Sequence, residues 1–170
     1  VKMILEAGQM LCAAHWLHLF KNYYEGEITD FKRVKDLKAW LTDDANTHPL
    51  ERPAWGLTHM RHPCTIWTNE SYDNYMWHWR LGVALCHEYT KRYKRQHKAE
   101  AVFDWLGKNK PRLMEHKGLT PFAICMKDEY KVGTDPVASY RQYYIKDKVR
   151  FAKWEPHSIT PKWYKEMLNA

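Results

Sequence analysis

The sequence lacks the motifs by which several large enzyme classes are recognised. It has no GxxxxGK[ST] phosphate loop, no GxGxxG dinucleotide motif, no GxSxG nucleophile elbow and no HExxH metal motif. It also has no alternating strand pair, no Asn-Gly hairpin turn and no visible internal repeat. These absences argue against the enzyme classes that carry such motifs, and they predict an all-α fold.

Closely spaced cysteines and long apolar runs are missing too. The four cysteines, Cys12, Cys64, Cys86 and Cys125, form no CxxC pair and have no short spacing to histidine that would indicate a zinc site. We therefore expect no metal and no cofactor, and a reducing, cytoplasmic setting in which Cys12 and Cys86 pack as small apolar residues. No apolar run approaches the roughly 18 residues that a membrane-spanning helix needs, so no membrane association is expected.

Positive charge and aromatic residues are abundant. The formal net charge is +7 and 15% of the 170 residues are aromatic. This combination predicts a polyanionic partner, most commonly nucleic acid, although the charge alone would also keep a protein in solution. The length suits a single domain covering residues 1–170. The chain starts at Val1 within a helical pattern, which suggests residues missing upstream.

The longest helical pattern lies between His62 and Lys98. Its apolar residues, mostly three or four positions apart, are Tyr72, Tyr75, Met76, Trp79, Val83, Cys86 and Tyr93. We expect a helix capped by Thr68 or Asn69 that extends to about Gln96, with Gly82 allowing a helix or a ligand to approach closely. A single compact helical domain should be built around this long central helix.

Shorter helical patterns cover residues 1–20, 28–43, 99–106 and 135–154, and a last helix should begin at Thr160-Pro161. Three prolines between residues 44 and 67 predict a long ordered loop, which is often functional in a small domain. This loop carries His48, His59 and His62. A metal site among these histidines, or at His15 and His18, would instead make the protein a metal-dependent enzyme.

The end of the central helix is strongly basic, with Lys91, Arg92, Lys94, Arg95, His97 and Lys98. Cations in a last helical turn complement the helix dipole, which is one interpretation. Their number exceeds what a dipole needs, so contacts with phosphates are the other. Cations beside aromatic rings are also typical of proteins that bind unstacked bases.

Three stretches resemble the pyrimidine-dimer DNA glycosylase family. They are KMILEAGQML near the start, the His62-Pro63 pair followed by a tyrosine-containing helix and LCHEYTKRY, and a late WYK. The likeness covers about a third of the chain. It does not extend to residues 21–61 or to the segment between Gly107 and Pro136.

The resemblance implies a DNA glycosylase and AP lyase. In that family a free N-terminal amine attacks the sugar C1′ and forms an imine, and the strand is then cut by β-elimination. A glutamate on an early helix supports this chemistry, and here it would be Glu6. Val1 is not expected to be the nucleophile, because the family's amine precedes this glutamate by a stretch that this chain lacks.

The hypothesis therefore assigns Glu6 as the catalytic carboxylate, and an ion pair with Lys2 one turn away is the structural alternative. The residues expected to contact DNA are Lys2, Gln9, His62, Arg80, Lys91, Arg92, Lys94, Arg95 and Lys98. The second hypothesis is a non-catalytic phage or bacterial accessory protein. It would use the same helical scaffold to bind nucleic acid, a nucleotide or a protein partner.

Overall fold

The computed structural model describes residues 2–111 and 113–169, and it confirms the all-α prediction. These residues form seven α-helices and three short 3-10 helices, and their only β-pairing is an isolated bridge between Val132 and Asp135. None of the described helices combines the length and apolar character needed to cross a membrane. The chain divides into two compact units, Val1–Thr120 and Pro121–Ala170. That residues 1–170 behave as one domain therefore stays a prediction.

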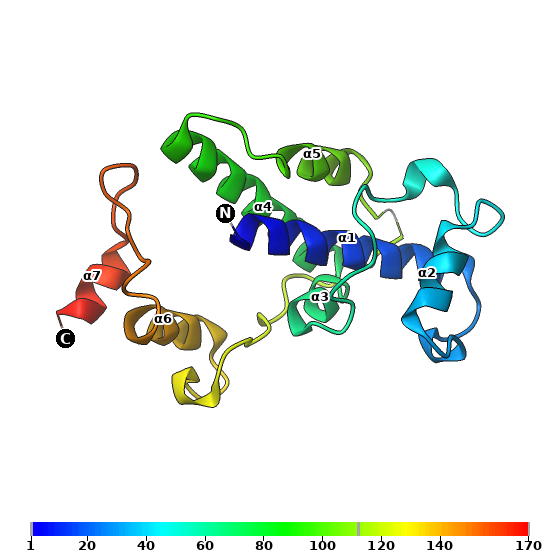
Figure 1. The fold of residues 1–170 in the computed structure, drawn as a ribbon. Coiled ribbons are helices and arrows are strands. Elements are labelled where there is room, and N and C mark those ends of the chain that lie inside the picture. Colours follow the sequence, from blue (N-terminus) through cyan, green and yellow to red (C-terminus); the bar gives the residue numbers. More distant parts are fainter. Residues whose placement is uncertain (1, 112, 170) are drawn as a thin grey trace. The chain divides into compact units, whose positions relative to one another are not determined.

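Helix α1 (Lys2–Tyr23) lies at the centre of the first unit. Every residue from Leu11 to Phe20 is buried, and a helix that is buried on all sides must be surrounded by other elements. It contacts α2 (Val34–Thr42), α3 (Pro63–Thr68), α4 (Tyr72–Tyr93) and α5 (Glu100–Lys108), and it runs beside α4 in Figure 1. The central helix is thus α1, although the sequence pattern predicted α4.

Two apolar clusters meet along α1. Its first half packs against α4 and α5 in a cluster that includes Leu11, Tyr75, Cys86 and Phe103. Its second half packs against α2 and the following loop in a cluster that includes Trp16, Phe20, Leu37, Leu41 and Leu57. Burial of these side chains holds both α2 and α4 against α1.

Helix α4 begins later than the sequence predicted. Its cap is Ser71, whose hydroxyl accepts a hydrogen bond from the Asn74 N–H at 3.1 Å, so neither Thr68 nor Asn69 caps it. Thr68 instead ends the separate helix α3, where its hydroxyl donates to the Cys64 carbonyl at 2.6 Å. A threonine already bonded within α3 does not cap the next helix.

Helix α4 also ends earlier than predicted, at Tyr93. Lys94 adopts the left-handed conformation with φ of 54°, and its N–H closes the helix on the Thr90 carbonyl at 2.9 Å. The chain then turns into α5, which lies close to α4. A Cβ at Gly82 would be 2.0 Å from Phe103 Cε1, which confirms that Gly82 allows a neighbouring helix to approach.

The proline-containing loop is ordered and includes a 3-10 helix, Pro49–Glu51. Another 3-10 helix, Ile28–Asp30, precedes α2. The loop lies against α1, since the Trp16 indole N–H donates to the Trp55 carbonyl at 2.9 Å. The Trp55 ring covers Gly8 of α1, where a Cβ would be 2.6 Å from it. Glycine at this position therefore lets the loop pack directly on the helix.

The second unit contains the 3-10 helix Asp128–Tyr130, α6 (Pro136–Lys146) and α7 (Lys162–Leu168). Asp135 caps α6 as predicted, because its carboxylate accepts from the Ala138 N–H at 3.0 Å. Helix α6 ends at Lys146 instead of near Trp154. Tyr164 of α7 is buried, and its ring centroid lies 4.4 Å from that of Trp154.

Candidate nucleic-acid interface and active site

The basic end, defined as Lys91, Arg92, Lys94, Arg95 and Lys98, covers the last turn of α4 and the turn after it. Only Lys91 and Arg92 belong to the helix. The left-handed Lys94 redirects the chain, so Lys94, Arg95 and Lys98 lie beyond the helix terminus and are exposed. The helix dipole acts within the last turn and explains at most the first two cations.

The cations of the basic end differ in their partners. The Arg92 Nε lies 2.6 Å from the Glu88 carboxylate one turn earlier. The Arg95 guanidinium donates to the Tyr89 hydroxyl at 2.9 Å and lies 5.9 Å from the centre of that ring. No carboxylate in the part of the chain that the structure describes forms an ion pair with Lys91, Lys94, Arg95 or Lys98. These four side chains leave a local excess of positive charge.

Arg80 extends this charge along α4. It lies on the exposed stripe of the helix, whose members recur every three or four residues. They are Trp77, Arg80, Leu81, Ala84, His87 and Lys91. Trp77 and Leu81 are 36% and 37% exposed, and the Trp77 ring packs edge-on against Trp67 at 5.7 Å. One exposed aromatic side chain, Trp77, therefore lies on the same stripe as Arg80, whereas the exposed Tyr93 lies on another face of the helix.

Glu6 lies on the second turn of α1, where Lys2 Nζ is 3.3 Å from its carboxylate. This confirms the ion pair between the two side chains. The Lys2 side chain is 86% exposed and that of Glu6 is 33% exposed. Exposed pairs of this kind contribute about 0.5 kcal/mol or less, so an incoming ligand can displace Lys2 at little cost. Gln9 is half-buried one turn further along.

His62 lies elsewhere, at the start of α3. Its Nδ1 accepts a hydrogen bond from the Cys64 N–H at 3.2 Å, so the proton of the neutral ring is on Nε2. Within the described residues, no hydrogen bond or ion pair joins Glu6 to His62 or Arg80. The structure thus groups Lys2 with Glu6 and groups the cations of the basic end, but His62 belongs to a separate pocket.

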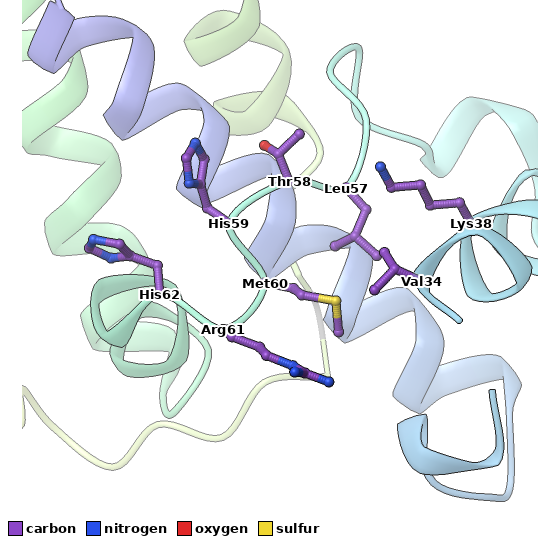
Figure 2. A pocket seen from close by; sticks show the side chains of 8 residues that line it. All are labelled: Val34, Lys38, Leu57, Thr58, His59, Met60, Arg61 and His62. Atoms are coloured by element: carbon purple, nitrogen blue, oxygen red, sulfur yellow. The ribbon is translucent and has the colours of Figure 1, made fainter. Parts of the chain in front are cut away.

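Sequence analysis did not identify Lys38 and Arg61 as site residues. They line the pocket beside His62, one from α2 and one from the loop (Figure 2). Positions 38 and 61 lie far apart in the chain, so no local sequence pattern joins them. The sequence signal that could have indicated Arg61 is a basic residue within a loop bounded by prolines.

The buried histidines have structural partners. His15 Nε2 donates to the Glu51 carbonyl at 3.1 Å, and its Nδ1 lies 3.4 Å from the Tyr75 hydroxyl. His18 Nε2 accepts from the Asn22 amide at 3.1 Å. Both nitrogens of His15 are therefore occupied, which argues against the metal site considered at His15 and His18.

His78 of α4 has a defined tautomer. The Thr68 hydroxyl gives its proton to the Cys64 carbonyl, so it must accept from His78 Nδ1, 2.7 Å away. Burial lowers the pKa of His15, His18 and His78 to about 4 in each case. All three are neutral at pH 7 and add nothing to the positive charge of the surface.

The buried cysteines behave as predicted. Burial raises the pKa of the Cys12 thiol to about 12 and that of Cys86 to about 11. Both remain protonated at neutral pH and pack in the core between α1, α4 and α5 as small apolar side chains.

Comparison with known proteins finds no matching family model, no matching curated protein and no matching solved structure.

Proposed function

We propose that the protein binds DNA through the basic end of α4 and acts, in an intracellular setting, as a glycosylase and AP lyase on damaged pyrimidines. The observation that carries the DNA-binding part is the excess of cations at Lys91, Lys94, Arg95 and Lys98. Ion pairs with described carboxylates neutralise none of them. The catalytic part rests on the resemblance of the sequence stretches to the pyrimidine-dimer glycosylases.

Phosphate contacts by these four cations have a measurable consequence. Each contact with duplex DNA contributes roughly 0.9 to the slope of log affinity against log salt concentration. Four contacts would give a slope of about −3.6, or roughly a hundredfold loss of affinity between 50 and 200 mM salt. Exposed aromatic side chains near the cations would add stacking with bases displaced at a damaged site.

In the proposed reaction an N-terminal α-amine bonds to the sugar C1′ as the bond to the damaged base breaks. An α-amine has a pKa near 8, so a substantial fraction is unprotonated at neutral pH. Glu6 would stabilise the positive charge of the imine and move protons during the later elimination. Its partial exposure leaves the carboxylate within reach of a substrate once Lys2 moves aside.

Borohydride trapping tests this reaction directly, because it reduces the imine to a stable protein–DNA adduct. Protein with its native N-terminus would be mixed with DNA that carries an abasic site or a pyrimidine dimer. We expect an adduct with the unchanged protein and a strong loss with Glu6→Gln. Glu25→Gln, at an exposed loop carboxylate, is the matched control and should trap normally. Equal trapping by Glu6→Gln and the unchanged protein would refute the assignment of Glu6.

A non-catalytic binding protein on the same scaffold is the second candidate. It is favoured by the Lys2–Glu6 ion pair, which gives Glu6 a structural role without catalysis. This candidate predicts salt-sensitive DNA binding with no trapped adduct and no cleaved strand. Salt-insensitive binding would argue against DNA as the partner in either candidate, and for the second candidate with a protein partner.

A further inference from the structure

A buried tyrosine lies under the turn from α4 to α5 (Figure 1). Tyr89 is 8% exposed and belongs to the core cluster that joins α1, α4 and α5. His97, which follows the left-handed turn, packs edge to face against its ring with centroids 4.8 Å apart. The His97 ring is fixed in turn, because its Nδ1 accepts a hydrogen bond from the Ala99 N–H at 3.1 Å. The core and the chain beyond the helix therefore both hold the Tyr89 ring in place.

The Tyr89 hydroxyl fixes the direction of Arg95. It accepts a hydrogen bond from the Arg95 Nε at 2.9 Å, and the guanidinium carbon lies 5.9 Å from the centre of the ring. Within residues 2–111 and 113–169, Arg95 makes no second hydrogen bond and no ion pair. Its two terminal amino groups are thus free to donate to the oxygens of a phosphate. An arginine that is already ordered also loses less conformational entropy when it binds.

The same ring holds Tyr93, the last residue of α4. The centroids of Tyr89 and Tyr93 lie 4.7 Å apart, and the two ring planes are 43° from parallel. Tyr89 supplies the only aromatic ring that contacts Tyr93 in the described parts of the chain, and the Tyr93 side chain is 55% exposed. Much of the Tyr93 ring is therefore available to a flat ligand.

Arg95 and Tyr93 are close neighbours because both contact Tyr89. Each distance is measured to the centre of the same ring, so the guanidinium and the Tyr93 ring are separated by no more than the two distances together. A phosphate and a base from the same or adjacent nucleotides can reach both groups. A cation beside an exposed ring is the combination with which proteins bind single nucleic-acid strands.

We propose that Tyr93 and Arg95 form a subsite for one unpaired nucleotide of a DNA strand, with its base stacked on Tyr93 and an adjacent phosphate on Arg95. Tyr89 is a positioning residue that holds both side chains. In paired duplex DNA each internal base is covered on both faces by its stacked neighbours, so Tyr93 gains no stacking there. The subsite rests on the proposed DNA binding and deepens it, because it gives the basic end a preference for DNA that contains an unstacked nucleotide.

Fluorescence anisotropy with undamaged probes tests this preference without a catalytic step. One probe is a fully paired duplex, and the other is the same duplex with a single unpaired thymidine. We expect the bulged duplex to bind about tenfold more tightly, the usual size of one base–aromatic stack. Tyr93→Leu keeps an apolar side chain without the flat ring and should reduce this preference to about twofold or less. Tyr23→Leu, at the 45% exposed tyrosine that ends α1, is the matched control and should retain it.

A double-mutant cycle tests the positioning role of Tyr89. Arg95→Gln alone should weaken binding of the bulged duplex about tenfold and reduce the salt slope by about 0.9. Tyr89→Phe keeps the buried ring and removes only the hydroxyl that holds Arg95. It should weaken binding in the otherwise unchanged protein and have no further effect in Arg95→Gln. Equal losses in both backgrounds would show that the hydroxyl has only a structural role and would refute the positioning of Arg95.

Two results would overturn the subsite. One is equal affinity of the unchanged protein for the paired and the bulged duplex, and the other is a full preference in Tyr93→Leu. Tyr93 and Arg95 are exposed, so both variants are expected to fold.

The same titrations separate this subsite from the proposed DNA binding. Salt-dependent binding of the paired duplex without any preference for the bulge would refute the subsite alone. Binding of neither duplex would refute DNA binding by the basic end and the subsite with it.

Discussion

Mild acid should destabilise the protein through its buried neutral histidines. Burial holds the pKa of His15 and His78 at about 4, against an ordinary value of 6.5. As the pH falls below 6.5 the unfolded chain takes up protons at these histidines, while the folded protein does not until about pH 4. The unfolded state then binds more protons, so the free energy of unfolding falls with pH across this window.

The size of the effect follows from the two pKa values. One pKa unit corresponds to about 1.4 kcal/mol, so each histidine lowers the free energy of unfolding by about 2 kcal/mol at pH 5 relative to pH 7. His15 and His78 together give about 4 kcal/mol, and His18 acts in the same direction. This is a large part of the 5–15 kcal/mol by which domains are usually stable.

Urea unfolding followed by tryptophan fluorescence would measure this loss at pH 7, 6 and 5, by linear extrapolation to water. His78→Gln should reduce the loss between pH 7 and pH 5 by about 2 kcal/mol, whatever its effect on stability at pH 7. His87→Gln is the matched control, since His87 is exposed on the same helix. The His87→Gln variant should lose as much free energy of unfolding between pH 7 and pH 5 as the unchanged protein.

The reasoning fails if unfolding requires the same free energy at pH 7 and pH 5. It also fails if His78→Gln loses as much stability as the unchanged protein over this interval. The second result would mean that His78 is protonated as easily in the folded protein as in the unfolded chain, and so is not desolvated by its contacts with α3.

Two further substitutions test the packing of α4 and the basic end. Gly82→Ala should destabilise the protein by about 1–3 kcal/mol in urea unfolding, because its Cβ meets the buried Phe103 ring at 2.0 Å. Gly56→Ala, whose Cβ meets nothing within 4 Å, should change stability by about 0.5 kcal/mol or less, and equal effects at both sites would refute the close contact. Lys94→Gly should retain or raise thermal stability, because glycine adopts the left-handed conformation without strain. If Lys94 contacts phosphate, the same variant should reduce the salt slope of DNA binding by about 0.9, and an unchanged slope would exclude that contact.

The helical class of the protein was predictable from local patterns. Apolar spacing located α1 and α4, and Asp135 followed by Pro136 marked the start of α6 correctly, because capping depends on neighbouring residues alone. The basic end was also visible, since its cations are consecutive or nearly so along the chain. Sequence reasoning placed the wrong helix at the centre, because amphipathic spacing does not reveal that Leu11 to Phe20 are covered on every side.

Helix boundaries depended on contacts that a local pattern does not contain. Thr68 has the side chain of a helix cap, but it is bonded to the Cys64 carbonyl and to His78, and Ser71 caps α4 instead. The left-handed turn at Lys94 ended a helix that apolar spacing would have continued. In both cases a competing hydrogen bond or backbone conformation overrode the periodic signal.

By itself, the sequence determined the all-α class, the basic end of α4 and the ion pair between Lys2 and Glu6, because each depends on residues within a few turns of one another. Only the tertiary structure decided which histidines are buried and neutral, and which line a pocket. Packing of α2 and the loop against α1 places Lys38 in the lining of the same pocket as Arg61 and His62. That arrangement joins residues more than twenty positions apart, and no periodic pattern specifies it.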